Sequence, residues 1–127
     1  MFRHAALASV FAGLLASSWA AETVTAPKDA ASIERGCELY ATHCAACHGT
    51  RGKGDGHATY VLPRRPKDFT NPDNLFSEDS DEDLLEVITY GKRSMPKYSK
   101  MLTQKERLQV IAYLRTIIPK VVPKSGG

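Results

Sequence analysis

The stretch CAACH at residues 44–48 constrains the fold of this chain more than any other. It closes a run of good helix formers that starts near Ala30, with Asp29 or Ser32 available as the N-cap, so the sequence predicts a helix over about residues 30–47. The chain contains three cysteines, and an odd number cannot all pair within one chain. The two thiols of this stretch therefore need a use other than a disulfide framework.

The spacing of these two thiols and of the histidine after them is typical of covalent haem attachment. Cys44 and Cys47 would each add to one vinyl group of a porphyrin, and the adjacent His48 would reach the iron as its proximal ligand. A thioredoxin-type redox dithiol belongs to a βαβ context, and a zinc site needs a second pair of ligands at suitable spacing; the sequence shows neither. The stretch therefore predicts one covalent haem c.

The third cysteine, Cys37, lies seven residues before Cys44, which is about two helical turns or roughly 10 Å. That distance excludes a bond between these two sulfurs within one helix. We expect Cys37 to be an inert helix residue, with an intermolecular disulfide or a redox-reactive thiol as the alternatives.

Two further helices are predicted after the haem motif. Ser80, with Asp83 three residues later, marks the start of the first of them, and Gly91 suits its end. Thr103 starts the second through a capping box, and Pro119 stops it. Both segments carry apolar residues at helical spacing, so each has a face that can be buried.

The segment of residues 49–76 is rich in glycine and proline and is expected to be mostly loop. A loop of this length in so small a domain is usually functional or wrapped around something. No run of alternating β-branched residues is present, so the predicted fold class is all-α, with three to four short helices packed around one covalently bound haem. The haem would act as the staple that so small a core often needs.

Gly36 and Tyr40 lie on the first predicted helix, and Tyr113 lies on the last. Over roughly residues 32–118 this pattern, together with the haem motif, resembles the class I c-type cytochromes, in which a glycine and an aromatic of the first helix meet an aromatic of the last. A residue without a side chain lets two helices cross closely, and neighbouring aromatic rings fill the flanks. The resemblance therefore implies the class I cytochrome c fold.

The resemblance also implies a second iron ligand. Met95 lies between the last two predicted helices and is followed by Pro96, as in the Met-Pro pair of the family. A thioether ligand favours reduced iron and raises the reduction potential, which suits electron transfer. Met101 is the main rival of Met95, and His57 and His43 come after it.

Residues 52–56 (GKGDG) and the prolines that follow them resemble a loop that lies beneath the haem in a subset of this family. In that subset a proline follows the last glycine, and its carbonyl accepts a hydrogen bond from the proximal histidine. His57 stands at that position here. The carbonyl of residue 57 is the first candidate to accept from His48 Nδ1, with Pro63 and Pro66 as the alternatives.

The first twenty residues have the character of a secretory signal. Arg3 and His4 form a short polar region, residues 5–15 are apolar, and small residues precede a cut after Ala20. An uncleaved membrane anchor is the alternative, but the apolar run is shorter than the roughly 20 residues that span a bilayer. The expected divisions are a signal peptide (1–20), an N-terminal leader (21–31), a cytochrome c domain (32–118) and a C-terminal tail (119–127), with the mature protein in the periplasm.

Charge is segregated along the chain, although the formal net charge is only +3. Residues 71–90 carry seven acidic side chains and no basic one, whereas residues 91–107 carry six basic and one acidic. Members of the family expose one haem edge near these loops, so we expect a basic rim to steer an acidic redox partner. A plain solvated surface is the alternative. The rim comprises Lys92, Arg93, Lys97 and Lys100.

The features above predict a soluble, exported, monomeric electron carrier with one haem and no catalytic residues. No nucleophile with a base and an orienting acid is recognisable, so we do not expect an enzyme. No nucleic-acid partner and no stable membrane insertion are expected, because the net charge is small and no second apolar stretch follows. Two alternatives stay open, a haem c subunit of a periplasmic dehydrogenase or oxidase complex and a haem sensor or enzyme with a labile distal methionine.

Overall fold

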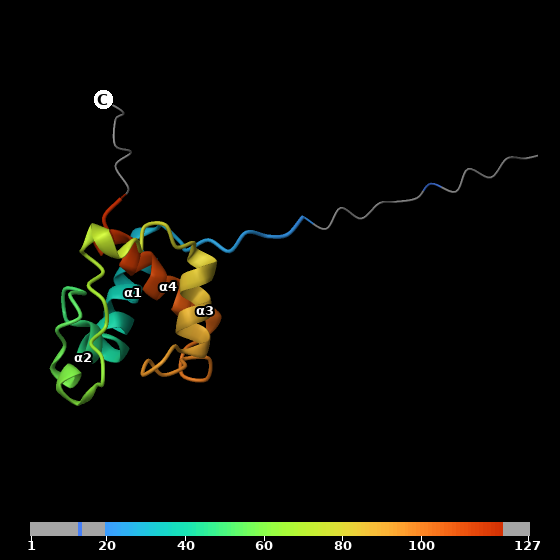
Figure 1. Cartoon of the computed structure of the whole chain (residues 1–127). Helices are drawn as coiled ribbons and strands as arrows, with labels where there is room; N and C mark the ends of the chain where they lie inside the picture. The colour runs from blue at the N-terminus through green and yellow to red at the C-terminus, as the bar shows by residue number, and fades with distance from the viewer. Residues whose placement is uncertain (1–12, 14–19, 121–127) are drawn as a thin grey trace, which may run out of the picture.

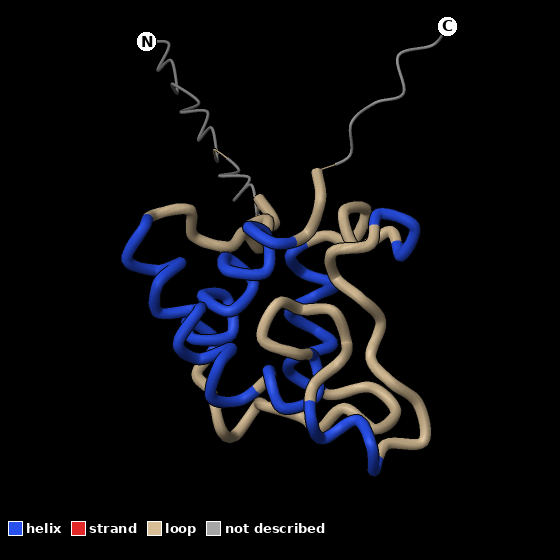
Figure 2. Tube along the Cα trace, turned by 90° about the vertical axis from the view of Figure 1, so that its left-hand side faces the viewer, coloured by secondary structure: helices blue, strands red, loops and turns tan. Residues whose placement is uncertain are grey.

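The computed structural model describes residue 13 and residues 20–120. In this part of the chain it shows four α-helices, two short 3₁₀ helices and no β-strand, which confirms the all-α fold class (Figure 2). Most of the signal peptide predicted over residues 1–20 and of the tail predicted over residues 119–127 lies outside the described residues, so these boundaries stay predictions. None of the described helices combines the length and the apolar character that a bilayer span requires.

The helix predicted over residues 30–47 is present but divided in two. Helix α1 (Ala30–His43) begins at Asp29, whose Oδ2 accepts a hydrogen bond from the Ser32 N–H at 2.9 Å. Helix α2 (Ala45–His48) follows after a single intervening residue. Of the two caps that the sequence offered, Asp29 and not Ser32 starts α1, because its carboxylate satisfies an otherwise unpaired N–H.

The division between the two helices falls at Cys44. The Cys44 N–H still donates to the Tyr40 carbonyl at 2.9 Å, as in a continuous helix. The N–H of Cys47, however, donates to the Cys44 carbonyl at 3.2 Å instead of reaching back to His43. The break therefore leaves the carbonyl of His43 without a backbone donor.

Helix α4 (Gln104–Ile117) crosses α1 near the centre of the molecule (Figure 1). A Cβ atom at buried Gly36 would overlap the carbonyl oxygen of Gln109 on α4 and lie 2.6 Å from its carbonyl carbon. The rings of Tyr40 and Tyr113 pack beside the crossing, with centroids 5.1 Å apart. The close helix crossing that the resemblance implied is confirmed.

Helix α3 (Asp81–Tyr90) packs against α4. Its capping box is formed as predicted, because Ser80 Oγ accepts from the Asp83 N–H at 3.1 Å and Asp83 Oδ2 accepts from the Ser80 N–H at 2.9 Å. Gly91 ends the helix with φ of 75°. Thr103 starts α4 through a second capping box, also as predicted. Local patterns therefore set the limits of both helices.

The apolar core lies along α4, against which both α1 and α3 pack. Val110 and Ile111 on α4 are 1% and 0% exposed. Leu39 of α1 and Leu84 and Ile88 of α3 are also buried in this cluster. Side chains of α1, α3 and α4 thus form a single core, and this core holds the crossing of α1 and α4 in place.

The loop predicted over residues 49–76 contains no α-helix. Two short 3₁₀ helices interrupt it, η1 (His57–Val61) and η2 (Pro72–Asn74). The backbone folds back on itself where the Phe69 N–H donates to the Gly52 carbonyl at 2.8 Å. The loop is therefore ordered by hydrogen bonds rather than by regular structure.

The leader predicted over residues 21–31 is tied to the domain at Ala26. Ala26 is buried, and its N–H donates to Asp81 Oδ2 at 2.7 Å. The other carboxylate oxygen of Asp81 pairs with Arg115 Nε at 2.7 Å. Arg115 also donates to the Asp79 carbonyl at 2.6 Å. One partly buried carboxylate thus joins the leader, α3 and α4, which the local sequence did not reveal.

Candidate functional site

The CAACH stretch forms the break after α1 and the whole of α2. Cys44 occupies the break, and His48 is the last residue of α2. The thiols of Cys44 and Cys47 are free and half-buried. Burial raises the pKa of the Cys44 thiol to about 12, and the nearby Cys47 adds to this, so the free thiol stays protonated at neutral pH. Two thiols and one imidazole are therefore brought together on a single short turn.

The ring of His48 is held by stacking rather than by hydrogen bonds. It lies against Phe69 with ring centroids 4.8 Å apart and an angle of 17° between the planes. Its Nδ1 is buried and has no hydrogen-bond partner, and burial lowers the pKa of the imidazole. The expected acceptors for this nitrogen, the carbonyls of residue 57, Pro63 and Pro66, do not accept from it. That prediction was wrong.

The physical reason lies in how the loop is folded beneath α2. His57 is the first residue of η1, and the carbonyls of a 3₁₀ helix point along its axis. Pro66 places its carbonyl against Gly54, where a side chain would overlap it. The Pro66 carbonyl therefore lies beside the glycine-rich loop, and no described group accepts a hydrogen bond from His48 Nδ1.

The glycine-rich loop is fastened to the carbonyl end of α2. The Gly54 N–H donates to the His48 carbonyl at 2.7 Å, and the Gly56 N–H donates to the Cys47 carbonyl at 3.1 Å. A Cβ at Gly56 would overlap the carbonyl oxygen of Ala46. Glycine at position 56 thus allows the loop to approach the motif closely enough for these bonds to form.

Two tyrosine hydroxyls bond to the carbonyls on either side of α2. Tyr40 donates to the Gly49 carbonyl at 2.6 Å, and Tyr98 donates to the His43 carbonyl at 2.8 Å. Burial raises the pKa of both phenols, so both keep the proton that they donate. Sequence patterns had indicated only the helix packing of Tyr40. Only one feature of the sequence indicated that Tyr98 contacts this region, namely its position three residues after Met95.

Met95 lies on a tight turn between α3 and α4. Two backbone hydrogen bonds between Lys92 and Met95, at 3.0 and 3.2 Å, close the turn. Gly91 and Arg93 adopt positive φ angles of 75° and 55° within it. The side chain of Met95 is half-buried and packs against the core. Figure 1 shows this turn (orange, below α3) and α2 on the two sides of the lower half of the molecule.

Two of the rival ligands, Met101 and His57, are less suited to a buried iron site than Met95. Met101 is 55% exposed, and the side chain of His57 is exposed at the start of η1. His43 is half-buried, with its ring centroid 6.2 Å from that of Tyr98. Burial therefore favours Met95 over Met101 and His57 as the second ligand, and it does not distinguish Met95 from His43.

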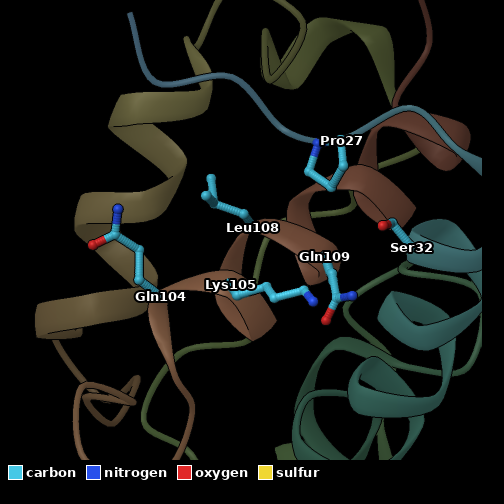
Figure 3. Close-up of a pocket in the computed structure, with 6 residues that line it drawn as sticks. All are labelled: Pro27, Ser32, Gln104, Lys105, Leu108 and Gln109. Atoms are coloured by element: carbon cyan, nitrogen blue, oxygen red, sulfur yellow. The ribbon is translucent and has the colours of Figure 1, made fainter. Parts of the chain in front are cut away.

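A shallow hollow of about 370 Å³ lies elsewhere, between the leader and the start of α4 (Figure 3). Its lining contains no thiol, imidazole or carboxylate: it consists of Pro27, Ser32, Gln104, Lys105, Leu108 and Gln109. Over residues 13 and 20–120, no three His, Cys, Asp or Glu side chains gather as a metal ion would require. The zinc alternative for the CAACH stretch therefore gains no support.

Residues 31–114 match the protein family described as "Cytochrome C oxidase, cbb3-type, subunit III". The chain belongs to this family of c-type cytochromes. This cytochrome is 27% identical over 100 residues to a protein of Corynebacterium diphtheriae named cytochrome bc1 complex cytochrome c subunit. That match covers 78% of this chain but 31% of the subunit, so the chain spans about a third of the length of that relative.

Smaller relatives match over more of their length. Cytochrome c6 of Thermosynechococcus vestitus is 27% identical over 85 residues, which cover 67% of this cytochrome and 70% of that protein. Among solved structures, cytochrome cL of Methylophaga aminisulfidivorans shares 24% identity with a TM-score of 0.58, covering 76% of this chain and 75% of the other. The latter likeness shows the class I cytochrome c fold.

Cytochromes of this family carry covalent haem c, which is therefore the cofactor of this cytochrome. The described residues fit such a group by their chemistry. Two free thiols lie on one turn with an imidazole whose side chain makes no hydrogen bond within the described chain. Thiols and an unengaged imidazole are the groups that thioether bonding and iron ligation use.

Proposed function

We propose that this chain is a soluble, exported monohaem cytochrome that passes single electrons between redox partners in the periplasm. Its haem is bound through Cys44 and Cys47, and its iron is held by His48 and Met95. The observation that carries the proposal is the CAACH turn, in which both thiols are free and the imidazole is unengaged. Export rests on the signal-like character of residues 1–20.

The chain's own residues have defined tasks in this proposal. Haem c, when bound, supplies a one-electron iron couple. His48 is oriented by its stacking on Phe69. Met95 is presented by a turn whose backbone is closed by hydrogen bonds to Lys92. Rigid placement of both ligands suits electron transfer, because little rearrangement is then needed between the oxidised and reduced states.

The CAACH turn disfavours Cys44 as the nucleophile of a thiol-disulfide oxidoreductase. The thiolate is the nucleophile of that chemistry, and reactive cysteines have a lowered pKa. Burial instead raises the pKa of the Cys44 thiol to about 12. Very little of the Cys44 thiol would therefore be present as thiolate at neutral pH.

Replacing Met95 by alanine is expected to remove the second iron ligand and to leave the haem attached. The oxidised native protein should show the charge-transfer absorption band of methionine-ligated iron, and Met95→Ala should lose this band completely. The reduced variant should then bind carbon monoxide rapidly, because one iron position is open. An absorption spectrum and a carbon monoxide titration of the purified holoprotein measure both effects.

Met101→Ala is the matched control, because Met101 is exposed and should leave the band unchanged. Loss of the band in Met101→Ala and not in Met95→Ala would assign the ligand to Met101. A native protein that lacks the band and binds carbon monoxide would instead favour the haem sensor or enzyme.

The basic rim comprises Lys92, Arg93, Lys97 and Lys100 around Met95, and all four side chains are exposed. Within the described chain, none of the four takes part in an ion pair. The rim and the acidic first turn of α3 lie at opposite ends of that helix (Figure 1). Unpaired positive charge beside the ligand turn favours a redox partner with an acidic docking surface.

Lys97→Glu is expected to slow oxidation of the reduced protein by ferricyanide, a small anionic probe, by about two- to fivefold at low ionic strength. Lys28→Glu is the matched control, because it makes the same change in net charge on the exposed leader. Stopped-flow rates should differ between the variants at low salt and converge as salt screens the charges. Equal slowing in both variants would contradict a local rim effect.

A haem c subunit of a larger redox complex is the second candidate. Tyr60 and Val61 of η1 are 86% and 85% exposed and stand side by side. Adjacent large apolar side chains left open to water favour a surface that another protein covers. Size and partner content after purification from the native host distinguish a free carrier from such a subunit.

A further inference from the structure

The segment that follows the Met95 turn is joined to the end of α1, directly before the haem motif, by one side-chain hydrogen bond. Tyr98 lies three residues after Met95, and its ring is buried. Its hydroxyl donates to the His43 carbonyl at 2.8 Å. Among the described residues, no other hydrogen bond links the segment 92–102 to α1 or α2.

The backbone of the same segment is fastened to the opposite side. The Tyr98 N–H donates to the Ile88 carbonyl at 3.0 Å, and the Ser99 N–H donates to the Thr89 carbonyl at 3.2 Å. Both acceptors lie on α3. Tyr98 therefore bridges α3, through its backbone, and the end of α1, through its hydroxyl.

The acceptor is available only because the helix is broken at Cys44. In a continuous helix, the Cys47 N–H would donate to the His43 carbonyl. It donates to the Cys44 carbonyl instead, so the phenol replaces the missing backbone donor. The position of the hydroxyl is thus set by the same break that places the first haem-binding thiol.

We propose that Tyr98 is a positioning residue, whose hydroxyl holds the Met95 turn at a fixed distance from the haem-binding turn. This inference rests on the proposed ligation of iron by His48 and Met95. Without the hydroxyl, the backbone of Tyr98 and Ser99 would still be bonded to α3. The turn that carries Met95 could then move away from the CAACH turn. The iron–thioether bond would then open more readily to an external ligand.

Tyr98→Phe tests the inference, because it removes one oxygen atom and keeps the buried ring. Oxidised holoprotein is titrated with imidazole, and displacement of Met95 is followed through the methionine–iron charge-transfer band. We expect Tyr98→Phe to bind imidazole about tenfold more tightly than the native protein, which corresponds to about 1.4 kcal/mol. Tyr90→Phe is the matched control, since Tyr90 is 71% exposed, and its imidazole affinity should be unchanged.

The outcomes separate the inference from the proposed function. A native protein without the band overturns the ligation by Met95, and the role of Tyr98 with it. A native protein with the band and a Tyr98→Phe variant of equal imidazole affinity overturn the role of Tyr98 alone. A Tyr98→Phe variant that fails to fold or to incorporate haem also overturns it, because the hydroxyl would then be a determinant of the fold.

Discussion

Replacing Cys44 and Cys47 together by alanine should abolish covalent haem attachment completely. A thioether bond needs the sulfur, and no other thiol lies on the turn that carries His48. The polypeptide produced in its own host should have the mass of the bare chain and give no haem stain after denaturation. Its unfolding temperature should also fall, because a bound group that stabilises only the folded state is lost.

Cys37→Ala provides the control for loss of a thiol. Cys37 is exposed on α1, whereas the other two cysteines are half-buried. We expect this variant to retain the mass of one haem. Covalent haem in the double variant, or a bare polypeptide mass for the native protein, would refute the proposed attachment.

Gly36→Ala should destabilise the protein, although alanine is the better helix former by about 1 kcal/mol. The added Cβ would overlap the Gln109 carbonyl oxygen, which is backbone and cannot rotate away. Overpacking of this kind typically costs about 1–3 kcal/mol. Overlap with a backbone atom puts the cost at the upper end of this range, so after the gain in helix propensity we expect a net loss of about 2 kcal/mol, which lowers the unfolding temperature by roughly 10 °C in a domain of this size.

The measurement is thermal unfolding of the holoprotein, followed by far-ultraviolet circular dichroism. Glu34→Ala is the control, because Glu34 is exposed on the same helix and its truncation adds no atoms. Its unfolding temperature should change little. A Gly36→Ala variant as stable as the native protein would show that α4 can shift and that helix propensity decides the outcome.

The helix limits were predictable because each depends on residues close in sequence. Asp29 caps α1, and the Ser80–Asp83 box starts α3 as its spacing indicated. The crossing at Gly36 was predictable for another reason, since the resemblance to class I cytochromes implied it. Short-range capping and a known packing pattern together therefore gave most of the architecture.

The features that were not predicted depend on contacts between distant segments. Nothing near Cys44 indicates that the helix breaks there, because the carbonyl that the break frees is satisfied by Tyr98, 55 residues beyond His43. The stacking of Phe69 on His48 is likewise a contact between separate segments. The acceptor predicted for His48 Nδ1 was wrong, since this nitrogen is buried without a hydrogen-bond partner, and the path of the loop past His48 cannot be derived from its composition.

The anchoring of the leader through Asp81 bears on the order in which the chain can mature. Ala26 bonds to a residue 55 positions later, and that residue is held in turn by Arg115, a further 34 positions along. Synthesis from the amino terminus produces Ala26 well before Arg115. The full set of contacts around Asp81 can therefore form only after nearly the whole domain has been synthesised, so the leader is fixed late although it comes before the helices in the sequence.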